Sequence, residues 1–273
     1  MKIRKEYTYT NKRQIWRLIP SSSNLIVEDR HIADKEVFFN CIDIESGKKI
    51  FENLQFEEKF WVGIEDVYDN VIIFHLYARP DMPGHREMFA YDIKDQSKIW
   101  RNEEYQFLFF HNGRMYCYKE LFEGRKYYML DYRTGDPIEE LYIDEKSVQL
   151  LKDKAMEDKD YSGYYFPDVY ENDNPLIDGI VKTLKEKYVI AGRIEYAIIN
   201  QALLLITFHE VLKDGSMNNI FKAIDLNKEK TIFDEVLDSK TNKYIPDAFF
   251  VKDNYLFLIK DKEKLIVCTI DLS

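Results

Sequence analysis

The chain has 273 residues, a formal charge of −10, and 45% hydrophobic and 15% aromatic residues. This composition allows a large core and excludes an intrinsically disordered chain. Lysine and arginine form no single basic stripe, which disfavours a nucleic acid as partner.

The first predicted element in chain order is an alternating strand over residues 2–10. Residues 1–16 are polar and charged and have no apolar signal-peptide core. No later apolar run is long enough to span a bilayer. We therefore expect a soluble cytoplasmic protein with no membrane partner.

From residue 23 onward, two signals recur in phase along the chain. The first is a tight turn of Asn, Asp or Gly, residues that tolerate the positive φ of two-residue hairpins. These turns are predicted at Ser23-Asn24, Asp69-Asn70, Asn112-Gly113, Asn200-Gln201 and Asp253-Asn254. The second is a strand that ends in aspartate, at Asp43, Asp92, Asp131, Asp225 and Asp271.

Each repeat unit thus predicts a strand, a tight turn, a second strand, a longer connection, a third strand with its aspartate, and a fourth strand. Most repeat spacings are close to the roughly 40–50 residues of a four-stranded propeller blade. We expect an all-β fold, a β-propeller of about five four-stranded blades, as a single domain over residues 1–273. The last unit lacks a fourth strand, so the strand over residues 2–10 would complete it and close the ring.

The step from Asp131 to Asp225 is about twice the other repeat spacings. Between these residues, Ser147–Met156 and Pro175–Tyr188 have helical apolar spacing, with Pro175 at a first helical position. We expect a partly helical insertion over residues 144–192, next to the channel mouth of the propeller. A degenerate sixth blade is the alternative.

Two segments, residues 39–51 and 128–138, each contain a strand, an aspartate, an apolar residue and a turn glycine. They resemble the quinoprotein-type (PQQ-like) blade repeat, which implies a propeller; no quinone-binding residue carries over. The order of Ile15-Trp16-Arg17-Leu18, Leu54-Gln55-Phe56, Trp61-Val62-Gly63 and Pro83-Gly84-His85 is similar to a bacterial family catalogued only as a domain of unknown function. That resemblance supports the fold and implies no activity.

The longer connections of a propeller share one face, where we expect any pocket. His31, His85, Arg86 and His209 fall in these connections and are interpreted as solvated loop residues, with a shared metal or catalytic site as the alternative. His75 lies in an apolar strand and is predicted to be a hydrogen-bonded core histidine. His111 is expected to be exposed. Cys41, Cys117 and Cys268 lack metal-ligand spacing and are predicted to be reduced and buried.

Aromatic residues near the start of innermost strands would either stack on a ligand at the channel mouth or pack as ordinary core. They are Trp16, Trp61, Tyr105, Tyr196 and Tyr244. The hypothetical ligand site consists of Trp16, Trp61, Glu65, His85, Arg86, Tyr196 and His209. No metal ligand set and no cofactor motif is identified.

The leading functional hypothesis is a non-enzymatic scaffold that binds a partner protein or a small polar ligand through its loop-rich face. The alternative is a glycosidase-like hydrolase, which needs two carboxylates on either side of a sugar. Its carboxylates would come from Glu65, Asp81, Asp168, Glu195 and Asp247, among which the sequence singles out no pair.

Overall fold

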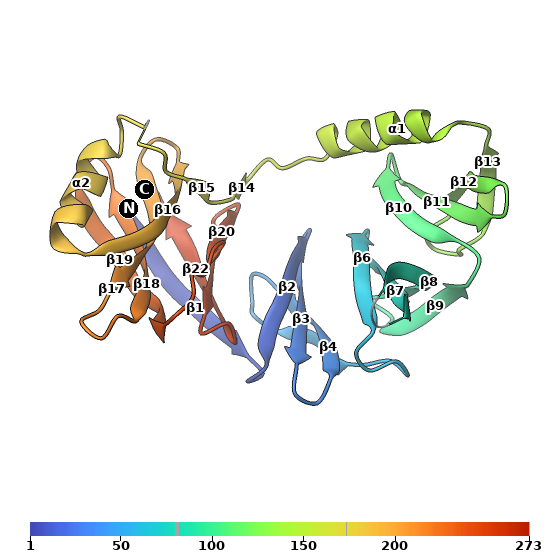
Figure 1. Ribbon diagram of the computed structural model, residues 1–273, viewed down its shortest axis with the longest axis horizontal. Helices are drawn as coiled ribbons and strands as arrows, with labels where there is room; N and C mark the ends of the chain where they lie inside the picture. Colours follow the sequence, from blue (N-terminus) through green and yellow to red (C-terminus); the bar gives the residue numbers. More distant parts are fainter. Residues whose placement is uncertain (80–81, 173, 273) are drawn as a thin grey trace. The chain divides into compact units, whose positions relative to one another are not determined.

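The computed structural model describes residues 1–79, 82–172 and 174–272 (Figure 1). In this part of the chain the strands form five sheets of four or five antiparallel strands, and there are two helices. The prediction of an all-β fold is confirmed. The chain divides into two compact units, residues 16–160 and residues 1–15 with 161–273.

Residues 16–160 contain three four-stranded sheets, each formed by consecutive strands in the predicted order. The first consists of β2 (Gln14–Ser21), β3 (Asn24–His31), β4 (Glu36–Asp43) and β5 (Lys49–Leu54). The second consists of β6 (Val62–Tyr68), β7 (Val71–Arg79), β8 (Met82–Asp92) and β9 (Ser97–Asn102). The third consists of β10 (Gln106–His111), β11 (Arg114–Leu121), β12 (Gly124–Leu130) and β13 (Pro137–Leu141).

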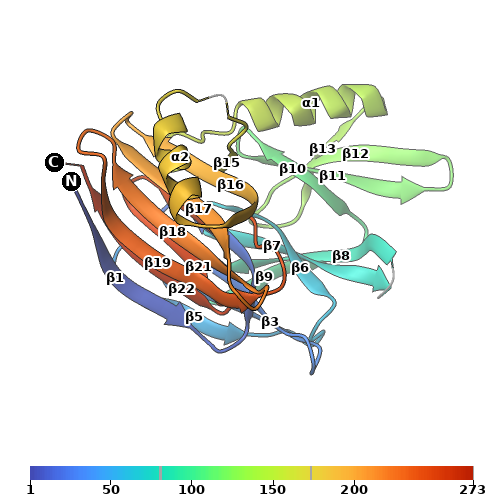
Figure 2. The same ribbon diagram turned by 60° about the vertical axis from the view of Figure 1, so that its left-hand side comes forward.

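The other unit contains two five-stranded sheets. One has β15 (Asp168–Val169), β16 (Ile190–Ile199), β17 (Leu203–Val211), β18 (Met217–Asp225) and β19 (Lys230–Thr241) in this order. The second has the order β1 (Lys2–Thr10), β22 (Lys264–Asp271), β21 (Tyr255–Lys260), β20 (Phe249–Lys252) and β14 (Tyr164–Tyr165). The predicted pairing of the N-terminal strand with the last unit is confirmed, and the two chain ends lie side by side in Figures 1 and 2.

Local chemistry explains the recurring turns. Asp69 and Asn70 have φ of 42° and 64°, so both turn residues adopt the left-handed conformation of a type I′ hairpin. The first turn lies one residue earlier than predicted, at residues 22 and 23, because β3 already begins at Asn24. The repeated aspartates cap the next turn: Asp92 Oδ1 accepts from the backbone N–H groups of Lys94 and Asp95 at 2.8 and 2.9 Å.

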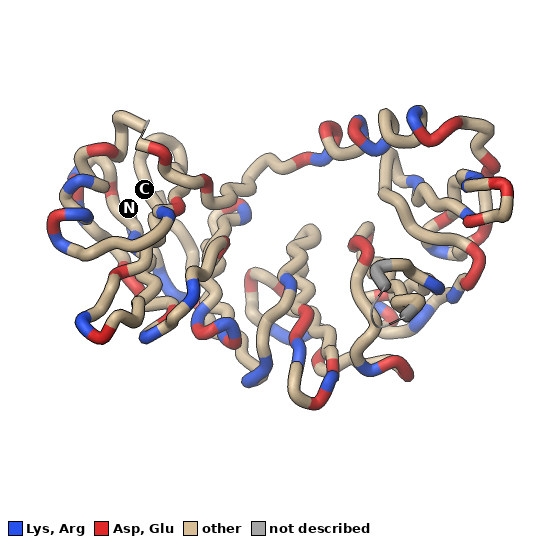
Figure 3. Tube along the Cα trace, viewed as in Figure 1, with Lys and Arg blue, Asp and Glu red and all other residues tan. Residues whose placement is uncertain are grey.

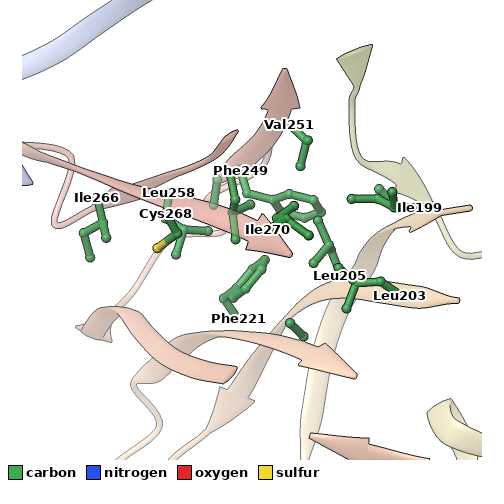
Figure 4. Packing of buried hydrophobic residues seen from close by; sticks show 14 of the residues in the cluster. Ile199, Leu203, Leu205, Phe221, Phe249, Val251, Leu258, Ile266, Cys268 and Ile270 are labelled. Atoms are coloured by element: carbon green, nitrogen blue, oxygen red, sulfur yellow. The ribbon is translucent and has the colours of Figure 1, made fainter. Parts of the chain in front are cut away.

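Each unit has its own apolar packing. In residues 16–160, aromatic rings of neighbouring sheets interlock, with Phe39 to Phe74 and Phe56 to Phe89 both 4.7 Å apart between ring centroids. In the other unit, Phe221, Phe249, Leu258 and Cys268 pack together between two sheets (Figure 4). The three cysteines are free and buried, as predicted.

The segment over residues 144–192 contains α1 (Glu145–Glu157) and α2 (Asp178–Lys187), each beside the sheet of its own unit (Figures 1 and 2). Val148 and Ala155 of α1 pack with Phe109 of β10. Val181 and Leu184 of α2 pack on the apolar face of β17. The predicted helix start at Pro175 is wrong, because turn hydrogen bonds to the Asn174 carbonyl precede α2.

Charged residues of both signs are interspersed along the chain (Figure 3). Among the described residues, neither helix is long and apolar enough to cross a membrane. The expected exposure of His111 is wrong: its side chain is buried, and Nε2 lies 3.0 Å from Asp158 Oδ2.

Candidate metal centre

Three adjacent strands of one sheet bring a carboxylate and two imidazoles together. Glu65 of β6, His75 of β7 and His85 of β8 each offer one metal-ligand atom, and these atoms all lie within 4.8 Å of one another. Glu65 Oε1 is 3.2 Å from Nδ1 of His75 and 2.6 Å from Nδ1 of His85. The two imidazole rings stack with centroids 3.6 Å apart and an interplanar angle of 7°.

Register shifts in the β6–β7 and β7–β8 ladders create this convergence. Counting from the hairpin at Asp69-Asn70, a regular ladder would pair Glu65 with Phe74, on the face opposite to His75. The register instead shifts between Ile64 and Asp66, so Glu65 is the extra residue of a bulge. Because a bulge re-aims its side chain, Glu65 is able to reach His75.

The register shift in the β7–β8 ladder acts on His85. From the pair Arg79 and Met82, a regular ladder would place His85 opposite Leu76, whereas the observed register pairs His85 with Tyr77. A shift of one residue moves a side chain to the other face of a sheet, so this shift puts His85 on the face of His75. A further shift lies between the pairs Tyr77–His85 and Leu76–Glu87, where Arg86 is the unpaired residue and is exposed.

Gly63 provides the space that His75 occupies. The two residues are directly opposite in the β6–β7 ladder. A Cβ atom on residue 63 would lie 2.8 Å from Cε1 and 2.9 Å from Nε2 of His75, distances that real Cβ contacts essentially never show. The position therefore requires glycine as long as the imidazole keeps its place.

The cluster is buried and its hydrogen-bonding capacity is unmet. The side chains of Glu65, His75 and His85 are 13%, 6% and 27% exposed. Among the described residues, Glu65 Oε1 and both ring nitrogens of His75 are buried atoms without a hydrogen-bond partner, although Glu65 Oε1 lies close to both imidazoles. Buried polar atoms normally have a partner, which makes this cluster a candidate site for a bound ion.

Electrostatics keeps Glu65 ionised. Burial acts to raise the pKa of its carboxyl group, but the adjacent His75 and His85 outweigh burial and lower this pKa to about 2. A carboxylate at neutral pH is the form that ligates metal ions.

Aromatic side chains border the cluster on the same unit. The Tyr77 ring is edge-on to both imidazoles, at 4.7 and 5.5 Å between centroids, and contacts Trp61 at 6.2 Å. Trp61 contacts Phe60, over which the Arg30 guanidinium lies at 5.2 Å. The same guanidinium lies 4.8 Å over Trp16, which is 56% exposed. Trp16 and Trp61 are thus linked to the cluster through a chain of ring contacts.

The donor types suit a zinc-like ion, and the two stacked imidazole rings would have to turn out of their nearly parallel planes for both lone pairs to reach it. Ligand atoms about 2.0–2.2 Å from a tetrahedral ion are about 3.3–3.5 Å from each other. The distance from Glu65 to His75 already approaches this spacing, and the distance from Glu65 to His85 would have to open by less than about 1 Å. Two imidazoles and one carboxylate leave at least one coordination position for solvent or a ligand.

The structure changes several sequence-based interpretations. His85 and His209 lie in strands β8 and β17 rather than in loops, because β7 extends to Arg79 and β17 to Val211. His75 is buried as predicted, but without the hydrogen bonds expected of a core histidine. His31 is outside the cluster and 2.7 Å from Asp34.

The remaining predicted site residues lie in the other unit. His209 lines a cavity with Glu195. Tyr196 follows Glu195 on β16 and belongs to the opposite face, where its hydroxyl accepts a hydrogen bond from Asn174 Nδ2 at 3.2 Å. Asp81 lies outside the described residues. His75 was missed as a site residue, because its apolar neighbours indicate only a core strand.

Comparisons with known proteins add a partial family match. Residues 19–100 match the family described as a domain of unknown function, DUF4905. The matched stretch contains Glu65, His75 and His85. The match supports the predicted resemblance to an unknown-function family, while the quinoprotein-type repeat stays a prediction. No curated protein matches the chain.

Solved structures similar to this chain are distant. The uncharacterized protein lmo1340 from Listeria monocytogenes EGD-e has a TM-score of 0.35 and 11% identity, covering 90% of this chain and 75% of that chain. KlHsv2 with a loop replaced by a Gly-Ser linker has a TM-score of 0.32 and 12% identity, covering 95% of this chain and 98% of that chain. An exo-β-1,3-galactanase from Phanerochaete chrysosporium has a TM-score of 0.31 and 7% identity, covering 98% of this chain and 64% of that chain.

Proposed function

We propose that this protein is a binding scaffold that holds one divalent transition-metal ion through Glu65, His75 and His85. The observation that carries the proposal is the convergence of three ligand atoms within 4.8 Å from three different strands. Nitrogen and carboxylate oxygen donors suit zinc and its neighbours in the first transition row. The ion would in turn anchor a small polar ligand or a side chain of a partner protein at its open position.

The surroundings of Glu65 favour metal binding over a glycosidase-type reaction. A glycosidase pairs two carboxylates on either side of a sugar. Glu65 instead has two imidazoles in direct contact, and its lowered pKa makes it unsuited to donate a proton near neutral pH. The carboxylate therefore acts as a ligand in this proposal.

The finer architecture is part of the proposal. We infer that the five sheets are the blades of a β-propeller, with β1 as the outer strand of the last blade. The sheet orders and the pairing of β1 with β22 support this inference. A location in the cytoplasm is proposed because the three cysteines are free and buried.

Calorimetric titration of chelator-treated protein with Zn²⁺ tests the proposed site, with Co²⁺ absorption spectra as a second readout. We expect one bound ion per chain. Each of Glu65→Gln, His75→Gln and His85→Gln should weaken binding at least about tenfold, since each removes one of three ligands. Affinity should also fall as the pH is lowered, because protons compete with the metal ion for its ligand atoms.

His31→Gln is the matched control. His31 also lies close to a carboxylate, that of Asp34, but both side chains are exposed and outside the cluster. This variant should bind Zn²⁺ like the wild type. Equal affinity of the wild type and the three cluster variants would refute the metal site.

A further inference from the structure

The unit formed by residues 1–15 and 161–273 has a cavity of about 320 Å³. Glu195 of β16 and Thr207 and His209 of β17 provide its polar lining, and Tyr244 and Pro246 contribute an apolar wall. The volume is at the lower end of the range for small-molecule sites. Its residues are all separate from those of the proposed metal centre.

An irregular stretch of β16 shapes the cavity. Ala191 pairs with His209 and Glu195 pairs with Thr207, so residues 192–194 span the stretch that Phe208 alone spans on β17, and β16 has two extra residues here. Gly192 has φ of 71°, and a Cβ atom there would lie 2.3 Å from Cε1 of Tyr244. The Tyr244 ring therefore packs directly against the backbone at Gly192. It is still 55% exposed, so it offers a ring surface to a ligand.

His209 provides a hydrogen-bond donor. Its Nε2 accepts the backbone N–H of Ile245 at 3.1 Å, which leaves the proton of the neutral ring on Nδ1. Burial lowers the pKa of His209, so the ring is neutral at pH 7. Nδ1 has no hydrogen-bond partner among the described residues. In the ladder His209 is opposite Asn219, a fully buried side chain whose two amide atoms also lack partners.

Glu195 and Thr207 provide acceptors. Glu195 Oε2 accepts the backbone N–H of Asp247 at 3.0 Å, which fixes the carboxyl group in place. Burial, followed by the charge of Asp247, raises the pKa of Glu195. Hydrogen bonds from the Asp247 backbone N–H and the Thr207 side chain act in the opposite direction but do not outweigh burial. Glu195 in the lining disfavours an anionic ligand, and Arg193 in the lining disfavours a simple cation.

We propose that this cavity binds a neutral, hydroxyl-bearing ring of monosaccharide size. Ligand hydroxyl groups would accept from His209 Nδ1 and donate to Glu195 and Thr207. One face of the ring would stack on Tyr244. This combination of a flat apolar wall with a few fixed donors and acceptors matches the chemistry of a small uncharged polar ligand.

Saturation-transfer NMR with D-glucose, D-galactose, D-mannose and D-xylose tests the proposal. Each sugar is added at up to about 10 mM, because ligands of this size bind in the millimolar range or tighter. Acetate and methylammonium serve as charged probes. The buffer contains EDTA, so that the outcome is independent of metal binding. We expect at least one sugar, and neither charged probe, to receive saturation at pH 7.

Tyr244→Ala should weaken binding of that sugar about tenfold, since it removes the stacking surface. Gly192→Ala should have the same effect by displacing the Tyr244 ring. Tyr142→Ala is the matched control, because Tyr142 is 91% exposed and belongs to the other unit. Thermal melting checks that each variant is folded. Saturation of none of the sugars, saturation of a charged probe, or equal binding by Tyr244→Ala and Tyr142→Ala would overturn the proposal.

Discussion

Replacing Gly63 by alanine is the most direct perturbation of the proposed metal centre, because it changes no ligand. The new methyl group would lie 2.8 Å from Cε1 of His75, so the imidazole has to move by about 0.5 Å or more to reach an ordinary contact distance. His85 stacks on the same ring and Tyr77 lies edge-on to it, which limits the direction of this movement.

Overpacking of this kind typically costs about 1–3 kcal/mol. For a chain of this size, that cost lowers the Tm by about 2–10 °C. Displacing a ligand also weakens metal binding, by about 10–100-fold when its support is lost. We therefore expect Gly63→Ala to melt earlier than the wild type and to bind Zn²⁺ more weakly, as measured by calorimetry and thermal unfolding with and without the ion.

Gly84→Ala is the control for this prediction. It lies in the same sheet, but its Cβ atom would meet nothing closer than Ala78 Cβ at 3.9 Å. We expect its stability to change by no more than about 0.5 kcal/mol and its Zn²⁺ affinity to stay the same. The reasoning is refuted if Gly63→Ala binds Zn²⁺ as tightly as Gly84→Ala does, since His75 would then not depend on the space at residue 63.

Two further predictions concern buried titratable groups. Burial, followed by the charge of Asp261, raises the pKa of Asp238 to about 6. The native state therefore binds a proton more tightly than the unfolded state, and the free energy of unfolding decreases as the pH rises from about 4 to 6. Asp238→Asn should remove this dependence and, after discounting for solvent screening, stabilise the protein by about 1–2 kcal/mol at pH 7 in urea unfolding. Burial also raises the pKa of Cys41 to about 12 and of Cys268 to about 11, so thiol reagents at pH 7 should label the native protein far more slowly than the urea-unfolded chain; equal labelling rates would contradict the assigned burial.

Strand order was predictable because its signals are local. A turn such as Asp69-Asn70 needs left-handed backbone, and a strand-ending aspartate such as Asp92 satisfies the backbone N–H groups of its own turn. Both signals depend on residues within three positions of each other, so a single sequence contains them. The pairing of β1 with β22 followed by elimination, since one unit lacked a strand and one strand lacked a unit.

The metal cluster was not predictable, because it depends on register. His85 was predicted to lie in a longer connection, whereas β8 already begins at Met82. Even with the correct strands, regular alternation would place Glu65 and His85 on the face opposite to His75. Only the register shifts in the two ladders reverse this arrangement, and these shifts leave no distinct residue pattern here. Gly63 within an apolar strand was the one available signal of a close approach.

The pairing of β1 with β22 leads to a final prediction, on deletion of residues 2–10. β1 pairs with β22 from Lys2–Asp271 to Thr10–Lys264 and buries Tyr9, which is 4% exposed. The deletion removes these backbone hydrogen bonds and the burial of Tyr9, which alone is worth about 1.5–3 kcal/mol. It also leaves β22, with its buried Ile266 and Cys268, as an unpaired edge.

We therefore expect the truncated protein to melt several degrees lower and to aggregate more readily, as measured by thermal unfolding and light scattering. A synthetic peptide of residues 2–10 should restore the Tm in a concentration-dependent way, because an extended peptide can pair with a free edge strand. A peptide with Tyr9 replaced by alanine keeps the backbone donors but loses the buried ring, so it should restore less. An unchanged Tm of the truncated protein, or equal rescue by both peptides, would show that the β1–β22 ladder contributes little to the stability of this unit.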